Sequence, residues 1–87
     1  MAKIVIYTKA NCPFCHWAKQ LLDHKNATYE EIRVDLDEKQ RTEMERISGR
    51  RTVPQIFIND QPIGGFDDLS KLEKEGKLAV LLNQEEK

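Results

Sequence analysis

The segment TKANCPFCHWAK, residues 8–19, holds both cysteines of the chain, Cys12 and Cys15, at a C-x-x-C spacing. It overlaps the end of a β-branched run, KIVIYT at residues 3–8, which is apolar on both faces and predicts a strand buried on two sides. Pro13 suits the first turn of a helix, where its missing N–H group would have no intrahelical partner. The segment therefore predicts a strand-to-helix junction with Cys12 at the N-terminus of the helix.

Further along the chain, apolar residues recur at helical spacing until Asn26, which is a suitable left-handed stop. TYEEIRV, residues 28–34, predicts a second strand that is polar enough to lie at a sheet edge. Asp35 or Asp37 is expected to cap a second helix, and Gly49 to end it. This β-α-β start implies two parallel strands joined by a right-handed crossover.

The second half of the chain predicts a hairpin followed by a helix. Residues 53–58 are apolar and predict a third strand, residues 59–60 (Asn-Asp) its turn, and residues 61–64 a short fourth strand. Asp67 or Asp68 is expected to cap the next helix. A last helical turn or two and a fraying polar tail are expected to follow.

The predicted order βαβαββα indicates an α/β fold with a four-stranded mixed sheet and helices on both faces. The length of 87 residues predicts one domain, residues 1–87. The formal net charge of −1 gives no reason to expect a nucleic-acid partner, and no apolar run is long enough to span a membrane. The first residues, MAKIVIYT, do not resemble a signal peptide, so we expect a cytoplasmic protein with reduced thiols.

The predicted position of Cys12 favours redox chemistry. At a helix N-terminus, unpaired N–H groups and the helix dipole favour a thiolate, and cysteine pKa values of about 3.5–7.5 occur in such settings, against about 8.5 for a free thiol. Lys9 would add a positive charge nearby. Cys15 is expected to be more buried, so that Cys12 attacks a disulfide and Cys15 resolves the product.

Two other interpretations of the cysteine pair remain open at this point. Both cysteines could be ordinary core residues, although the strand-to-helix context is the one in which C-x-x-C is typical of redox proteins. A zinc site would need four ligands, and His16 and His24 would have to supply two of them. His16 is expected to point away from Cys12, and His24 lies about two helical turns beyond Cys15, so we expect no metal site.

Three motifs in this order, CPFC at residues 12–15, TVP at residues 52–54 and GGFDDL at residues 64–69, resemble the glutaredoxins, specifically the small bacterial-type dithiol glutaredoxins. The resemblance implies a thioredoxin-like fold and a monomer that uses glutathione as co-substrate, with no bound cofactor. It implies a glutathione-dependent thiol–disulfide oxidoreductase that reduces protein disulfides and glutathione mixed disulfides in cell redox homeostasis.

The resemblance also implies a glutathione site. Pro54 would follow a cis peptide bond that turns the Val53 backbone toward Cys12, where it can pair with glutathione as an added strand. The start of the helix after GGFDD would bind the γ-glutamyl group. The positions that match the family's site are Lys9, Phe14, Arg41, Thr52, Val53, Pro54, Gly65, Phe66, Asp67 and Asp68.

Three aromatic residues depart from the family's commonest pattern. Phe14 stands where tyrosine is frequent, Phe66 where relatives carry a small residue or a cysteine, and Trp17 is unusual at its position. Trp17 is expected to be partly exposed and is a candidate contact for a partner protein.

Two other functions are alternatives to the glutaredoxin hypothesis. A thioredoxin-like electron donor would use a flavoprotein reductase, but the chain is short and lacks the Trp-Cys-Gly-Pro-Cys pattern. Relatives with a single cysteine followed by glycine more closely resemble an iron–sulfur cluster carrier, and Pro13 and the second thiol of this chain argue against that role. The expected protein substrates carry disulfides or glutathionylated cysteines, and ribonucleotide reductase is one candidate that the resemblance suggests.

Overall fold

The computed structural model describes residues 2–84 and has the predicted order of elements. They are β1 (Ile4–Thr8), α1 (Pro13–His24), β2 (Glu30–Arg33), α2 (Glu38–Ser48), β3 (Gln55–Ile58), β4 (Gln61–Gly64), α3 (Phe66–Lys74) and α4 (Leu78–Leu82). The strands form one mixed sheet in the order β2-β1-β3-β4. β1 runs parallel to β2 and antiparallel to β3, and β4 is antiparallel to β3.

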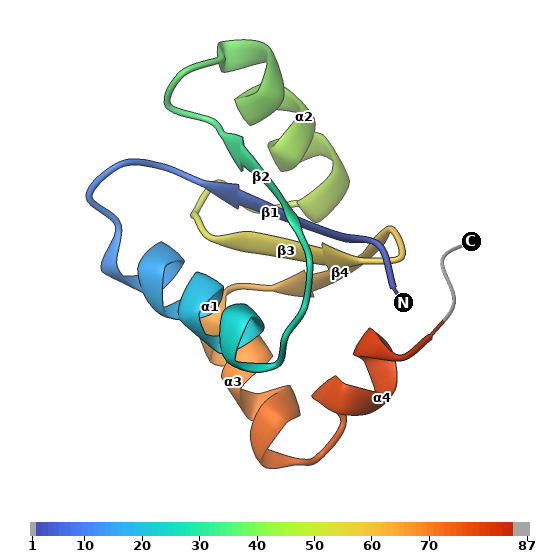
Figure 1. Ribbon diagram of the computed structural model, residues 1–87. Helices are drawn as coiled ribbons and strands as arrows, with labels where there is room; N and C mark the ends of the chain where they lie inside the picture. Colours follow the sequence, from blue (N-terminus) through green and yellow to red (C-terminus); the bar gives the residue numbers. More distant parts are fainter. Residues whose placement is uncertain (1, 85–87) are drawn as a thin grey trace.

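Helices cover both faces of this sheet, as predicted (Figure 1). On one face, α1, α3 and α4 pack against apolar side chains of β1 and β3, and Ile6, Leu22 and Leu69 are fully buried there. On the other face, Met44 of α2 is fully buried against Tyr7 and Phe57. Because β1 and β3 are buried on both faces, they read in the sequence as continuous apolar runs.

Most predicted helix ends are confirmed. Pro13 occupies the first position of α1, and Asn26 has the predicted left-handed conformation, with φ of 58°. Asp37, not Asp35, caps α2, and its carboxylate accepts a hydrogen bond from the Lys39 N–H group at 2.9 Å. Gly49 ends α2 with φ of 73°.

Three predicted boundaries are wrong. The second strand spans Glu30–Arg33 and not residues 28–34. Gly65 is the N-cap of α3, so Asp67 and Asp68 lie within its first turn, and only Asp68 contributes to the cap, by accepting a hydrogen bond from the Gly65 N–H group. The third strand begins at Gln55 and not at residue 53, because Val53 and Pro54 form a loop with a cis peptide bond.

The predicted hairpin turn at residues 59–60 is confirmed, with positive φ at both positions. The end of the predicted polar tail lies outside the described residues. Among residues 2–84, no helix has the length and the apolar character needed to cross a membrane.

Candidate active site

Cys12 lies at the junction that the sequence predicted, between the end of β1 and the start of α1. It is the N-cap of α1, and its Sγ atom accepts a hydrogen bond from the backbone N–H group of Cys15 at 3.2 Å. Cys12 and Cys15 form a disulfide, with Cα atoms 5.2 Å apart. Cys12 is half-buried, whereas Cys15 is only 2% exposed. The sulfur of Cys12 is therefore the more accessible of the two.

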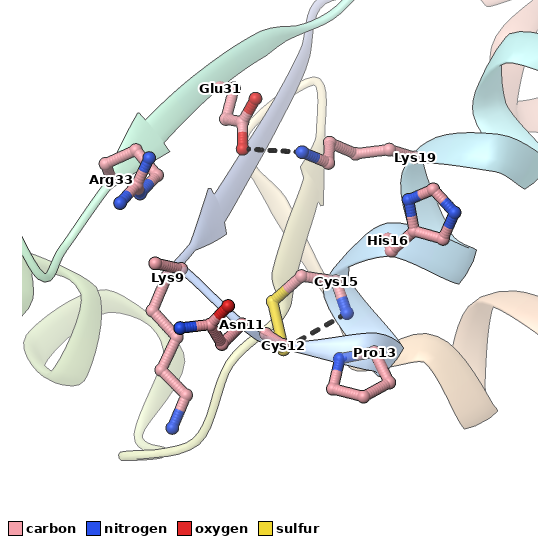
Figure 2. A pocket seen from close by; sticks show the side chains of 10 residues that line it. Lys9, Asn11, Cys12, Pro13, Cys15, His16, Lys19, Glu31 and Arg33 are labelled. Carbon is pink, nitrogen blue, oxygen red and sulfur yellow. Dashed lines mark hydrogen bonds and ion pairs between the residues drawn. A yellow bond between two sulfur atoms is a disulfide. The ribbon is translucent and has the colours of Figure 1, made fainter.

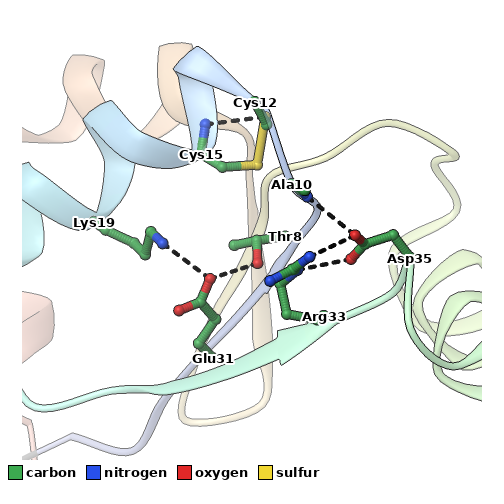
Figure 3. A network of polar contacts seen from close by, with 8 residues as sticks. All are labelled: Thr8, Ala10, Cys12, Cys15, Lys19, Glu31, Arg33 and Asp35. Atoms are coloured by element: carbon green, nitrogen blue, oxygen red, sulfur yellow. Dashed lines mark hydrogen bonds and ion pairs between the residues drawn. A yellow bond between two sulfur atoms is a disulfide. The ribbon is translucent and has the colours of Figure 1, made fainter.

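An ion pair holds the loop that leads from β1 to Cys12. The Arg33 guanidinium donates two hydrogen bonds to the Asp35 carboxylate, at 2.7 and 2.6 Å. The same carboxylate accepts a hydrogen bond from the backbone N–H group of Ala10 at 3.2 Å (Figure 3). The Arg33 hydrogen bonds hold the pKa of Asp35 well below its usual range. The sequence suggested only a capping role for Asp35, so this contact to the loop was missed.

A second polar network ties α1 to the edge strand β2. The hydroxyl group of Thr8, which is fully buried, donates to Glu31 Oε2 at 2.6 Å, and Lys19 Nζ contacts the same oxygen at 3.0 Å (Figure 3). The Thr8 hydrogen bond, helped by Lys19, lowers the pKa of Glu31. Beside the disulfide, this network therefore links β1 through Thr8, β2 through Glu31 and α1 through Lys19.

A cavity of about 560 Å³ opens on this side of the disulfide (Figure 2). Both cysteines line it, together with side chains from the loop, α1 and β2: Lys9, Ala10, Asn11, Pro13, His16, Lys19, Glu31 and Arg33. His16 also lines this cavity, and its ring points away from Cys12 (Figure 2). Among residues 2–84 there is no cluster of three or more histidine, cysteine, aspartate or glutamate residues suited to a metal ion.

The loop before β3 also approaches Cys12. The peptide bond between Val53 and Pro54 is cis, as the resemblance implied, and the Val53 carbonyl oxygen lies 3.9 Å from Cys12 Sγ. The side chain of Gln55, which is 2% exposed, donates to the Thr52 carbonyl oxygen at 2.9 Å. Gln55 thus helps to hold the loop, and nothing in the sequence pattern indicated this role.

A second cavity, of about 270 Å³, lies between this loop and α3, and we call it the α3 groove. Eight of the ten predicted glutathione-site residues line it: Phe14, Thr52, Val53, Pro54, Gly65, Phe66, Asp67 and Asp68. The other two lie elsewhere. Lys9 lines the larger cavity, and the Arg41 guanidinium contacts Glu45 at 3.5 Å and the Arg51 carbonyl oxygen at 3.4 Å.

The two aspartates of the α3 groove differ in their contacts. Asp68 Oδ2 accepts hydrogen bonds from the Gly65 N–H group at 3.0 Å and from Arg50 Nη1 at 3.1 Å. The Gly65 hydrogen bond, followed by the Arg50 interaction, lowers the pKa of Asp68. Asp67 is exposed and has no polar partner among the described residues. The Asp67 carboxylate is therefore the one available to a ligand.

Comparisons with known proteins agree with this geometry. The glutaredoxin family model matches residues 4–63. Glutaredoxin 3 of Escherichia coli strain K12 is 51% identical over 82 residues, which cover 94% of this chain and 99% of that protein. The solution structure of glutaredoxin from Brucella melitensis superimposes with a TM-score of 0.83 at 49% identity, covering 94% of this chain and 89% of that one.

A complex of buckwheat glutaredoxin with glutathione also has the same fold, with a TM-score of 0.86 at 31% identity. That match covers 93% of this chain and 76% of the buckwheat chain. The fold and the overall sequence identity thus match those of known glutaredoxins over nearly the whole length of this chain. The chain belongs to the glutaredoxin family of glutathione-dependent thiol–disulfide oxidoreductases.

Proposed function

We propose that the chain is a dithiol glutaredoxin in which Cys12 attacks and Cys15 resolves. The observation that supports this division of roles is the asymmetry of the two sulfurs. Cys12 is half-buried at the N-cap of α1 and accepts the Cys15 N–H hydrogen bond, whereas Cys15 is 2% exposed. The N–H group and the positive end of the helix dipole would stabilise a Cys12 thiolate once the disulfide is reduced.

With a glutathione mixed disulfide, Cys12 alone would suffice. The Cys12 thiolate attacks the glutathione sulfur, the bond to the substrate sulfur breaks, and the substrate thiolate leaves with the electron pair and takes a proton. A second glutathione thiolate then attacks the glutathione sulfur held on Cys12. Glutathione disulfide forms, and the Cys12 thiolate is regenerated.

With a protein disulfide, both cysteines would be needed. The Cys12 thiolate attacks one substrate sulfur, and the other substrate sulfur leaves as a thiolate. The Cys15 thiolate, after loss of its proton, attacks Cys12 Sγ and releases the reduced substrate, which leaves the Cys12–Cys15 disulfide. Two glutathione molecules reduce this disulfide in turn and become glutathione disulfide.

In this proposal glutathione lies in the α3 groove. Its cysteinyl backbone would pair with the Val53 backbone, whose carbonyl oxygen is already near Cys12 Sγ. Its γ-glutamyl carboxylate would meet the N–H groups at the start of α3, and its ammonium group the Asp67 carboxylate. Lys9 and Arg41 are proposed to attract the glycyl carboxylate by charge.

The test is turnover of the mixed disulfide of cysteine and glutathione, coupled to glutathione reductase, by wild type and by two cysteine variants. Cys12→Ser should abolish turnover. Cys15→Ser should retain turnover of this small substrate but lose the reduction of a protein disulfide. If Cys15→Ser also lost the mixed disulfide reaction, the proposed division of roles would be wrong.

A second assay replaces glutathione and glutathione reductase with thioredoxin reductase. A thioredoxin-like electron donor should be active only in this second assay. Membership of the glutaredoxin family argues against that alternative. The cluster-carrier alternative predicts visible absorption after anaerobic reconstitution with iron and sulfide. Our proposal predicts no such absorption, because Pro13 and a second thiol that closes the Cys12–Cys15 disulfide disfavour a cluster.

We further propose that residues 1–87 form one domain that acts as a monomer in the cytoplasm, where thiols stay reduced. Its protein partners would be disulfide-bearing or glutathionylated proteins, with ribonucleotide reductase as one candidate. Reduction of oxidised ribonucleotide reductase by the purified protein and glutathione would test that candidate directly.

A further inference from the structure

Three aromatic side chains form a cluster on the surface beside the disulfide. Phe14 and Trp17 lie one helical turn apart on α1, and Phe66 is the first residue of α3. The ring centroids of Phe14 and Trp17 are 5.3 Å apart, and those of Trp17 and Phe66 are 5.9 Å apart. Phe14 is 50% exposed and Trp17 is 45% exposed. We call these three residues the aromatic cluster.

The packing of the fold does not account for this cluster. Phe66 packs partly against the core, but neither Phe14 nor Trp17 is among the residues that form or cover the two hydrophobic cores. Their rings contact each other edge to face, with an interplanar angle of 88°. Exposed apolar groups gathered in one place are typical of interaction sites, whereas single exposed apolar residues are common everywhere.

The aromatic cluster separates two hollows of the surface. Phe14 and Phe66 line the α3 groove, where we place glutathione. Trp17 and Phe66 line an adjoining cavity of about 460 Å³ between α1 and α3. Its other lining residues are Gln20, Leu21, His24, Ser70, Glu73 and Lys74. The apolar surface therefore extends from the α3 groove, where glutathione is placed, into the adjoining cavity between α1 and α3.

The charges around this adjoining cavity favour an acidic ligand group. Glu73 is neutralised by an ion pair with Lys25 at 3.0 Å. Lys74 is exposed and has no polar partner within the described part of the chain. An acidic side chain that entered the cavity would therefore meet a cation that no carboxylate among residues 2–84 already engages.

We propose that the aromatic cluster and the adjoining cavity bind the polypeptide segment that flanks the disulfide of a protein substrate. The segment carries a bulky apolar side chain next to the reacting cysteine and an acidic residue beyond it. Every protein substrate must bring its sulfur to Cys12, two residues before Phe14, so its flanking chain is held against this surface. The inference rests on the proposed dithiol function.

The test compares two synthetic peptides, each closed by one disulfide. The first has phenylalanine next to one cysteine and glutamate beyond it, and the second has alanine in place of phenylalanine. Their kcat/KM values are measured with glutathione and glutathione reductase. Wild type should prefer the phenylalanine peptide about tenfold, the effect of one well-placed apolar side chain in a pocket.

Variants at Trp17 separate binding from folding and from chemistry. Trp17→Ala should remove the preference, and Trp17→Phe should retain most of it. Val80→Ala is the matched control, because Val80 is also exposed, at 63%, but lies on α4. All three variants should turn over the mixed disulfide of cysteine and glutathione at the wild-type rate.

A binding measurement needs no reaction, because Trp17 is the only tryptophan of the chain. Versions of the peptides with serine for cysteine should shift its fluorescence emission only when they contain phenylalanine. Equal kcat/KM values for the two peptides in wild type, or an unchanged preference in Trp17→Ala, would overturn the docking proposal. Wild type that reduces neither peptide but still turns over the mixed disulfide of cysteine and glutathione would overturn both the dithiol route and the docking proposal.

Discussion

Thr8 is fully buried at the end of β1, and its hydroxyl group donates a short hydrogen bond to the Glu31 carboxylate. Lys19 contacts the same carboxylate from α1. A hydrogen bond to a charged group stabilises that charge, which is why the pKa of Glu31 is lowered. A single threonine thereby links the sheet edge to the helix that carries both cysteines.

Thr8→Val keeps the shape of this side chain and removes the hydroxyl group. The pKa of Glu31 should rise toward its ordinary value, and the free energy of unfolding at neutral pH should fall by about 1–2 kcal/mol. Urea unfolding and NMR titration of the Glu31 carboxyl group measure the two effects. An unchanged Glu31 pKa would contradict the role given to Thr8.

The same contact sets a pH dependence. Because the folded pKa of Glu31 is lowered, its stabilising contribution is complete above the ordinary pKa of glutamate, about 4.3, and is lost as the pH falls through the lower folded value. Wild type should therefore lose stability relative to Thr8→Val as the pH falls through this range. Parallel stability curves for the two proteins would show that the hydrogen bond contributes nothing.

At the scale of elements, the site depends on how the ends of α1 and α3 are held. α1 is positioned by the loop that Asp35 and Arg33 fix through the Ala10 N–H group. α3 begins at Gly65, directly after Gly64, which has φ of 115°. A Cβ atom at Gly64 would collide with the Asp68 carboxylate. The sheet–helix connections, more than the helices themselves, shape the α3 groove.

Gly64→Ala should therefore displace the start of α3 and raise the KM for the mixed disulfide of cysteine and glutathione several-fold. Gly76→Ala is the matched control, because Gly76 also has a positive φ, of 73°, but a Cβ atom there would meet nothing within 4 Å. Both variants should lower the free energy of unfolding by about 1 kcal/mol or more. A raised KM in both variants would mean that stability, and not the groove, is responsible.

Asp35→Asn tests the other connection. Loss of the carboxylate charge weakens the contacts with Arg33 and with the Ala10 N–H group and loosens the loop before Cys12, so mixed-disulfide turnover should fall several-fold. Asp37→Asn is the control, because asparagine can still cap α2. Wild-type kinetics in Asp35→Asn would show that the loop is held without this carboxylate.

At the scale of the whole molecule, two cores lie on the two faces of one sheet, and the smaller one depends on α2. Met44 is fully buried in it, so Met44→Ala should lower the free energy of unfolding by about 2–5 kcal/mol. Leu36→Ala should leave it nearly unchanged, because Leu36 is 75% exposed. Urea unfolding compares them, and equal losses would contradict the assigned core.

The sequence predicted the features of this fold that depend on local signals. Pro13 and Asp37 mark helix starts through their own backbone and side-chain chemistry, so the helices and the position of Cys12 could be predicted from a few neighbouring residues. The Glu31 and Gln55 contacts could not, because their partners are fixed only by strand pairing and loop closure. Asp68 was expected at a helix cap, and its contact with Arg50 likewise depends on two distant segments meeting.

The proposed mechanism depends most directly on the acidity of one thiol, that of Cys12 at the start of α1. Titration of the Cys15→Ser variant, followed by thiolate ultraviolet absorbance, measures it without interference from the second thiol. We predict a pKa at least one unit below the value of about 8.5 for a free cysteine, because the helix N-terminus and the N–H group of residue 15 stabilise the thiolate. A pKa of about 8.5 or higher would contradict the proposed mechanism.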